Sequence, residues 1–247
     1  MSTDLKSIGL GFDRWQDAVE AAIATDRLAV TGEVRGGQLI QYSDNSGAQI
    51  NILAVEPFAT YAGFDSATRT YGNVSMVNDV LAYLEVMDPF GKSMMAVTAN
   101  LAQGPILVDE PTQEWAELGV TALVLGHKVY DSTDVYQETT GELVGQLISE
   151  GAQIVAAGDG AAAPDASAQF SARVLEAEYR INQLTNQRFI YAQVDGAFPF
   201  DVCLPDAEEL PQPGNVIVGT AVMTAAVKSP MGGGCGGCGG SCGCGGH

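Results

Sequence analysis

The run FPFDVCL, residues 198–204, places apolar side chains at every second position. These side chains are Phe198, Phe200, Val202 and Leu204. Alternation with a period of two is typical of a β-strand that turns one face to the core. Cys203 falls on the opposite face, with no His or cationic residue close to it in sequence to activate its thiol. We therefore interpret Cys203 as a small buried hydrophobic residue and not as a nucleophile.

Similar runs occur along most of the chain, and turn sequences separate them. We predict strands at residues 28–34, 38–43, 49–55, 74–88, 94–101, 119–130, 173–184, 188–195 and 215–227. Arg35-Gly36-Gly37 and Asp44-Asn45-Ser46-Gly47 have the composition of tight turns. The predicted fold class is therefore α+β and mainly β, with a β-meander and barrel-like lobes.

Residues 12–25 show a different, helical spacing. Their apolar positions are Phe12, Trp15, Val19, Ala22 and Ile23, and Asp13 with Gln16 suggests a capping box. We predict an N-terminal amphipathic helix here. Two weaker patterns predict a short helix or turn at 111–118 and a helix at 141–150.

Residues 156–168, AAGDGAAAPDASA, have the composition of a connecting loop. We predict a first unit at 1–155 with the N-terminal helix and a β-rich lobe, a linker at 156–168, a second β-rich lobe at 169–230 and a flexible tail at 231–247. Gly72-Asn73-Val74 and Gly214-Asn215-Val216 each precede a long predicted strand. This echo has two interpretations, namely common turn chemistry or two related β lobes.

The charge of the chain limits its partners. The 30 acidic residues outnumber the 11 basic ones, which gives a formal net charge of −19. Such a chain repels nucleic acid and anionic lipid surfaces, so neither is an expected partner. There is no run of 18 apolar residues and no apolar signal-like segment at the start, and four of the five cysteines lie in the last 13 residues. The body has no possible internal disulfide pair, and we expect a cytoplasmic protein.

The tail contains the clearest chemical pattern, C-x2-C-x3-C-x-C-x2-H. Its donors are Cys235, Cys238, Cys242, Cys244 and His247. Thiolates and imidazole bind Zn²⁺ in tetrahedral sites, and thiolates also suit Cu⁺. The intervening residues are nearly all Gly, so the backbone can wrap closely around an ion. The absence of a long spacer between ligand pairs favours capture or transfer, with a metal-accepting protein as a further partner.

Other interpretations of the tail remain open. Neighbouring thiols can form local disulfides, so the tail is a candidate reversible dithiol. A low-complexity segment with inert cysteines is a second alternative. In Gly, Ser and Cys composition alone, the tail also resembles precursor peptides that are heterocyclised to azoles.

The body offers no catalytic or cofactor-binding pattern. His127 is the single His before the tail, and no Gly-x-Ser-x-Gly elbow accompanies it. The acidic groups Asp131, Asp134, Glu138 and Glu142, and Asp206, Glu208 and Glu209, lack calcium-loop spacing and are interpreted as solvated surfaces. We therefore favour a non-enzymatic binding protein with a metal-capturing tail. An enzyme or small-ligand-binding β domain with an unseen pocket, and an interaction or assembly module, are the alternatives.

Overall fold

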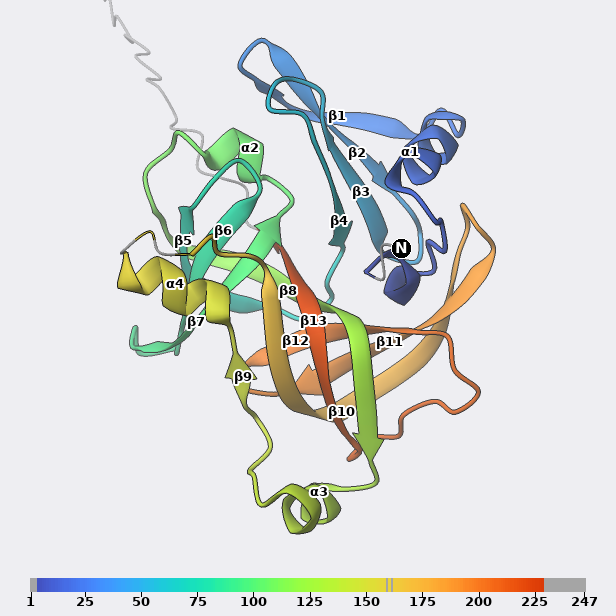
Figure 1. Cartoon of the computed structure of the whole chain (residues 1–247), viewed down its shortest axis with the longest axis vertical. Coiled ribbons are helices and arrows are strands. Elements are labelled where there is room, and N and C mark those ends of the chain that lie inside the picture. Colours follow the sequence, from blue (N-terminus) through green and yellow to red (C-terminus); the bar gives the residue numbers. More distant parts are fainter. Residues whose placement is uncertain (1–3, 159, 161, 229–247) are drawn as a thin grey trace, which may run out of the picture.

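Two β-sheets make up most of the structure, a computed structural model that describes residues 4–158, 160 and 162–228 (Figure 1). Strands account for 51% of it and helices for 15%. The prediction of a mainly β protein with a short N-terminal helix is confirmed. Within these described ranges, no helix has the length and apolar character needed to cross a membrane.

The smaller sheet is an antiparallel meander of four strands in chain order. They are β1 (Leu28–Val34), β2 (Gly37–Ser43), β3 (Ala48–Leu53) and β4 (Ala59–Phe64). Arg35 and Gly36 both have positive φ, at 48° and 80°, and form the type of tight turn that matches the twist of a β-hairpin. The next turn is held by Asp44, whose carboxylate accepts a hydrogen bond from the Ser46 backbone N–H at 2.9 Å. The first three strands agree with predicted ones within two residues, whereas β4 has no predicted counterpart.

The larger sheet has nine strands in the order β11-β12-β8-β5-β6-β7-β13-β10-β9, with additional pairing of β10 to β11 and of β8 to β13. They are β5 (Thr70–Met76), β6 (Leu81–Met87), β7 (Ser93–Leu101), β8 (Gln113–Tyr130), β9 (Leu147–Ile148), β10 (Ser167–Asn182), β11 (Gln187–Asp195), β12 (Pro199–Pro205) and β13 (Val216–Val227). Because β8 and β13 are long, each can pair with different neighbours along its length.

These pairings close two five-strand rings that share β8 and β13. One ring is β8-β5-β6-β7-β13, and the other is β13-β10-β11-β12-β8. Each contains a meander of three strands and one parallel pair, β7 with β13 in the first and β12 with β8 in the second. The arrangement is thus repeated, with β5 equivalent to β10 and β8 to β13. The sequence echo does not follow this repeat, because Gly72 lies inside β5 whereas Gly214 precedes β13.

The segment at 156–168 overlaps the end of α4 (Glu150–Ala157) and the start of β10. The nine-stranded sheet takes strands from both sides of this segment. The division into units at 1–155 and 169–230, and a common origin of the two lobes, remain predictions.

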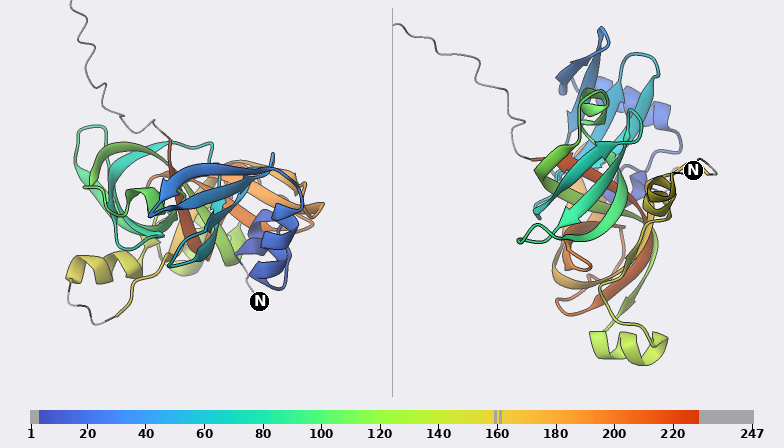
Figure 2. Two further views of the ribbon diagram at one scale, coloured as in Figure 1. Left: turned by 90° about the horizontal axis from the view of Figure 1, so that it is seen from above. Right: turned by 90° about the vertical axis from the view of Figure 1, so that its left-hand side faces the viewer.

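Short helices cover parts of the sheets (Figures 1 and 2). Besides α4 they are the 3₁₀ helix η1 (Leu5–Ile8), α1 (Trp15–Ile23), α2 (Gly104–Leu107) and α3 (Thr133–Thr140). Helix α1 lies inside the predicted range and buries Ala18 and Ala22, while Ile23 is exposed. The predicted capping box is not formed, because Arg14 occupies the N-cap position and its guanidinium pairs with Asp17.

Three other predicted elements are wrong. Residues 113–118 belong to β8, where Leu118 pairs with Thr70 of β5. The predicted helix at 141–150 is replaced by a loop and β9, because Gly141 ends α3 with a φ of 76° and the Ser149 hydroxyl caps α4. Residues 74–88 form two strands, because the Asn78 side chain accepts the backbone N–H groups of the turn between β5 and β6.

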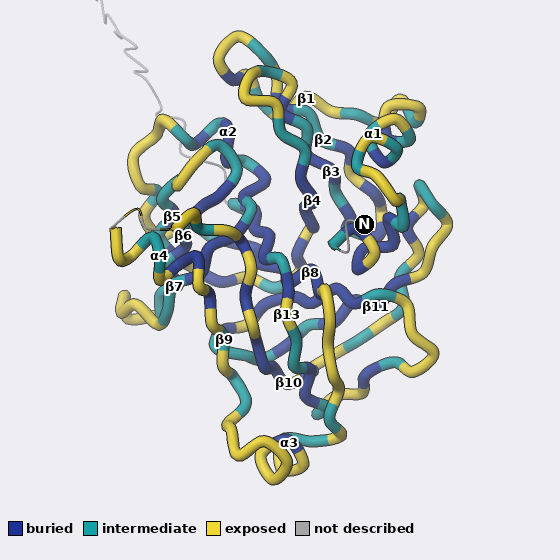
Figure 3. Tube along the Cα trace, in the orientation of Figure 1, coloured by how far each residue is buried: buried dark blue, intermediate teal, exposed yellow. Residues whose placement is uncertain are grey.

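The core has two main clusters, one among strands of the larger sheet and one that joins this sheet to η1, α1 and the smaller sheet. Buried residues are dark blue in Figure 3. Phe200, Val202 and Leu204 of β12 pack inside the second ring. Cys203 points the other way and packs with Leu123 and with residues of η1, α1 and the smaller sheet. Strand β12 is therefore buried on both faces. Full burial of one large apolar side chain contributes about 1.5–3 kcal/mol, so this strand is a major source of stability.

Candidate functional site

The five predicted metal ligands, Cys235, Cys238, Cys242, Cys244 and His247, lie outside the described residues. The last two described residues, Val227 and Lys228, are bonded to the body. The Gln103 carboxamide and the Val227 backbone form two hydrogen bonds, at 3.0 and 3.2 Å. The Lys228 backbone N–H donates to the Glu117 carbonyl at 2.8 Å, and its ammonium pairs with Asp65.

Cys203 is a free cysteine with no exposed surface. Burial, and secondarily the charge of Asp201, raises the pKa of its thiol well above the ordinary value. The thiolate is the nucleophilic and metal-binding form, so Cys203 is inert near neutral pH. This agrees with its interpretation as a buried hydrophobic residue.

Asp201, which the sequence analysis did not single out, is a fully buried carboxylate two residues earlier in β12. Its oxygens accept hydrogen bonds from the Ser66 hydroxyl at 2.8 Å, the Ala67 N–H at 2.7 Å, the Tyr191 hydroxyl at 2.9 Å and the Thr68 hydroxyl. Residues 65–69 join the smaller sheet to the larger one. Asp201 therefore holds this joining segment in place, and no sequence motif predicts that role.

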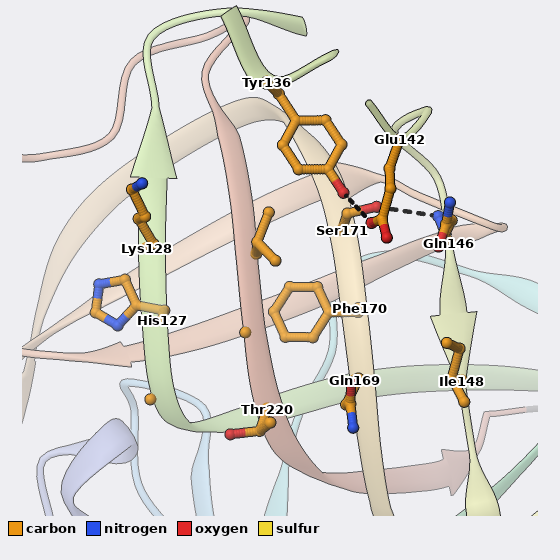
Figure 4. A pocket seen from close by; sticks show the side chains of 13 residues that line it. His127, Lys128, Tyr136, Glu142, Gln146, Ile148, Gln169, Phe170, Ser171 and Thr220 are labelled. Carbon is orange, nitrogen blue, oxygen red and sulfur yellow. Dashed lines mark hydrogen bonds between the residues drawn. The ribbon is translucent and has the colours of Figure 1, made fainter. Parts of the chain in front are cut away.

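A cavity of about 390 Å³ lies where α3 folds back over the second ring (Figure 4). Strands β8, β13, β10 and β9 form its floor and side, and Tyr136 of α3 forms its roof. Its lining includes the charged groups of Lys128 and Glu142 and the polar side chains of Gln146, Gln169, Ser171 and Thr220.

Local interactions fix the roof of this cavity. The Tyr136 hydroxyl donates to the Glu142 carboxylate at 3.0 Å, and the Tyr136 ring packs edge-on against Tyr130 with centroids 5.2 Å apart. The Lys128 ammonium lies 4.4 Å from the centre of the Tyr130 ring, in a cation–π contact. Ser132 caps α3 by accepting the Val135 N–H at 3.2 Å. The roof therefore combines one aromatic pair with a cation and a carboxylate.

The opposite wall is held by the backbone of β10. Gln146 and Ser171 form two hydrogen bonds, from the Ser171 N–H to the Gln146 carbonyl at 2.9 Å and from the Gln146 N–H to the Ser171 hydroxyl at 3.1 Å. This wall can present amide and hydroxyl groups to a small polar ligand. The cavity is thus suited to binding through hydrogen bonds.

His127 is at the rim of the cavity, exposed and opposite Gly219 of β13. Figure 4 draws its imidazole on the side of β8 away from Tyr136. Partial desolvation of the imidazole lowers its pKa below the ordinary value. Across residues 4–158, 160 and 162–228, no three His, Cys, Asp or Glu side chains are grouped so as to hold a metal ion.

The two acidic groups are at the surface, as the solvated interpretation predicts. Asp131, Asp134, Glu138, Glu142, Asp206, Glu208 and Glu209 are all exposed. Asp206 pairs with Arg188 at 2.7 Å, and Glu142 with Tyr136.

Comparisons of the chain with protein-family models, with curated proteins and with solved structures find no match.

Proposed function

We propose that the protein is a non-enzymatic binding protein that captures a soft metal ion, Zn²⁺ or Cu⁺, with its C-terminal thiols. The observation that carries this proposal is the ligand series Cys235, Cys238, Cys242, Cys244 and His247. Five donors exceed the four of a closed tetrahedral zinc site. A surplus donor allows an incoming metal-accepting protein to replace the ligands one at a time, as metal transfer requires.

Two features of the body support this role. Its one thiol, Cys203, is buried and protonated, so it does not compete with the tail for a thiophilic ion. The net charge of −19 raises the local concentration of cations around the protein.

Elemental analysis of protein purified under reducing conditions tests this function. Intact protein is expected to hold about one equivalent of zinc or copper, and protein truncated at Pro230 none. His127→Ala is the matched control, because it removes the imidazole of the body and leaves the tail unchanged. Equal metal content in intact and truncated protein would place the metal elsewhere. If oxidation forms tail disulfides with a functional effect in metal-free protein, the tail is instead a redox element.

The cavity under α3 favours a second candidate function, the binding of a small polar ligand. Lys128, Glu142 and the carboxamide residues Gln146 and Gln169 line its 390 Å³, a volume within the usual range for small-molecule sites. Tyr136→Ala removes the side chain that covers the cavity and is expected to lower the affinity for such a ligand. Val135→Ala, on the exposed side of α3, is the control. A thermal-shift screen of small polar compounds against both variants distinguishes this function from one confined to the tail.

A further inference from the structure

A groove of about 540 Å³ lies at the end of the first ring, away from the cavity under α3. Its lining is mainly apolar and includes Tyr71, Met87, Pro89, Met94, Trp115 and Pro199. Trp115, Tyr71 and Met94 expose 49%, 48% and 51% of their surfaces. Large apolar side chains grouped at an exposed hollow are typical of interaction sites.

Trp115 adopts a backbone conformation that bulky residues rarely occupy. Its φ is +54°, in the left-handed region, at an irregularity in the pairing of β8 with β5. The Asn73 side chain accepts the Trp115 N–H at 3.2 Å, and Glu85 in turn accepts the amide of Asn73 at 3.0 Å. The surrounding residues therefore hold a strained bulge that presents the indole to solvent. Such strain is typical of sites where a side chain is presented for binding.

The turn between β6 and β7 forms the adjacent wall. One Asp88 oxygen accepts the backbone N–H groups of Phe90 and Lys92, each at 2.9 Å. Gly91 lies against the Trp115 indole, and a Cβ added to it would be 3.3 Å from an atom of that ring. Phe90 at the tip of the turn exposes 94% of its surface. The turn and the indole are thus in contact at Gly91.

The charges around this groove are mostly negative. Acidic residues on the elements that form it are Glu85, Asp88, Glu114 and Glu117. The Arg69 guanidinium at the groove is neutralised by Glu117 at 3.2 Å, which leaves Lys92 as the other nearby cation. With a net charge of −19, a second copy of this chain would be repelled. The complementary occupant is a cationic partner.

We propose that this groove docks an extended, proline-containing peptide segment of a partner protein that also carries Arg or Lys. Aromatic-lined grooves bind polyproline II segments, whose carbonyl groups are free to accept hydrogen bonds. The Trp115 indole N–H and the Tyr71 hydroxyl are suitable donors for such carbonyls. A guanidinium or ammonium group of the peptide can interact both with the aromatic faces and with Asp88 or Glu114. This interaction is independent of metal capture by the tail.

Selection from a phage-displayed library of random dodecapeptides on the immobilised full-length chain tests the proposal. We expect the enriched peptides to share prolines and basic residues. Their affinity for Trp115→Ala, measured with synthetic copies, should fall by about tenfold or more, as for an aromatic hot spot. Tyr71→Ala is a second variant with an intact bulge. Phe58→Ala, which removes a 73% exposed ring outside the groove, is the control.

Asp88→Asn isolates the contribution of charge. An asparagine side-chain oxygen can still accept the two backbone N–H groups of the turn, so the turn is retained. We expect weaker binding of basic peptides to this variant and a smaller salt dependence than for the unmodified chain, because one of the acidic groups at the groove is removed. The proposal is overturned if no peptides are enriched, if acidic peptides are enriched, or if they bind Trp115→Ala and Tyr71→Ala as tightly as the unmodified chain. A sedimentation coefficient that falls in Trp115→Ala would also overturn it, because the groove would then be an interface between copies.

Discussion

The hydroxyl of Tyr191 lies 2.9 Å from the carboxylate of Asp201, and both groups are buried where the smaller sheet meets the larger one. The Arg180 guanidinium lies 3.5 Å from the centre of the Tyr191 ring, on the side facing solvent. A buried carboxylate is tolerated only if its oxygens are hydrogen-bonded. Ser66 and Thr68, in the segment that joins the two sheets, and Tyr191, in the adjacent strand β11, provide these donors.

Tyr191→Phe is expected to lower the free energy of unfolding by about 1.5–3 kcal/mol, because it removes one hydrogen bond to a buried charge. Urea denaturation measures this change. Tyr83→Phe, on a half-buried position of β6, is the control and should be close to neutral. If both substitutions have equal effects, Asp201 does not depend on the Tyr191 hydroxyl.

Stability is expected to fall at alkaline pH. Burial raises the pKa of both Tyr191 and Cys203 in the folded protein. As the pH passes the ordinary values of about 8.5 for a thiol and about 10 for a phenol, the unfolded chain releases protons that the folded chain retains. The unfolded state then binds fewer protons, so the free energy of unfolding decreases by up to about 1.4 kcal/mol per pH unit for each such group.

The comparison between variants isolates this effect from general charge repulsion. Urea midpoints at pH 7.5 and 10.5 should decline less steeply for Tyr191→Phe than for the unmodified protein. Parallel declines would show that the Tyr191 phenol does not contribute.

Trp115→Gly is expected to be more stable than Trp115→Ala by about 1–2 kcal/mol. Glycine occupies the left-handed region without the clash of a Cβ atom, whereas alanine retains it. Thermal or urea unfolding of the two variants measures the difference. Should the alanine variant prove as stable as the glycine variant, the bulge at β8 relaxes and the indole is not held under strain.

Deletion of residues 231–247 is expected to leave the thermal midpoint almost unchanged. The last contacts of the body, at Val227 and Lys228, are all retained. A decrease of more than about 4–8 °C, which corresponds to roughly 1 kcal/mol in a small domain, would instead indicate that the tail stabilises the fold.

Much of the β structure is predictable because period-two patterns and turn residues are local signals. The strand that contains Val202 and the turn at Arg35 and Gly36 are found in this way. Residues 113–118 are predicted wrongly because Trp115 occupies a bulge, which interrupts the alternation. The closure of the rings depends on contacts such as Asp201 with Thr121, far apart in sequence, and no single strand indicates them.

The candidate sites also differ in whether local sequence signals reveal them. The thiols of the tail form a local motif and are visible in the sequence alone. The cavity under α3 joins Lys128, Tyr136 and Gln169 from separate elements, and the groove joins Tyr71 to Trp115. Asp201 is distinguished from an exposed carboxylate only by its hydrogen-bond donors, which come from residues 66–68 and Tyr191. A sequence pattern does not reveal these contacts.

Metal titration of the reduced, anaerobic full-length protein tests metal capture most directly. Zinc or copper(I) should bind in about one equivalent per chain, more tightly than micromolar, with release of protons and with an affinity that falls below about pH 7. The double substitution Cys238→Ser and Cys242→Ser should abolish this binding, and His127→Ala should leave it unchanged. Metal capture is contradicted if neither ion binds more tightly than about 1 μM, equivalent to about −8 kcal/mol, or if the double variant binds as tightly as the unmodified chain.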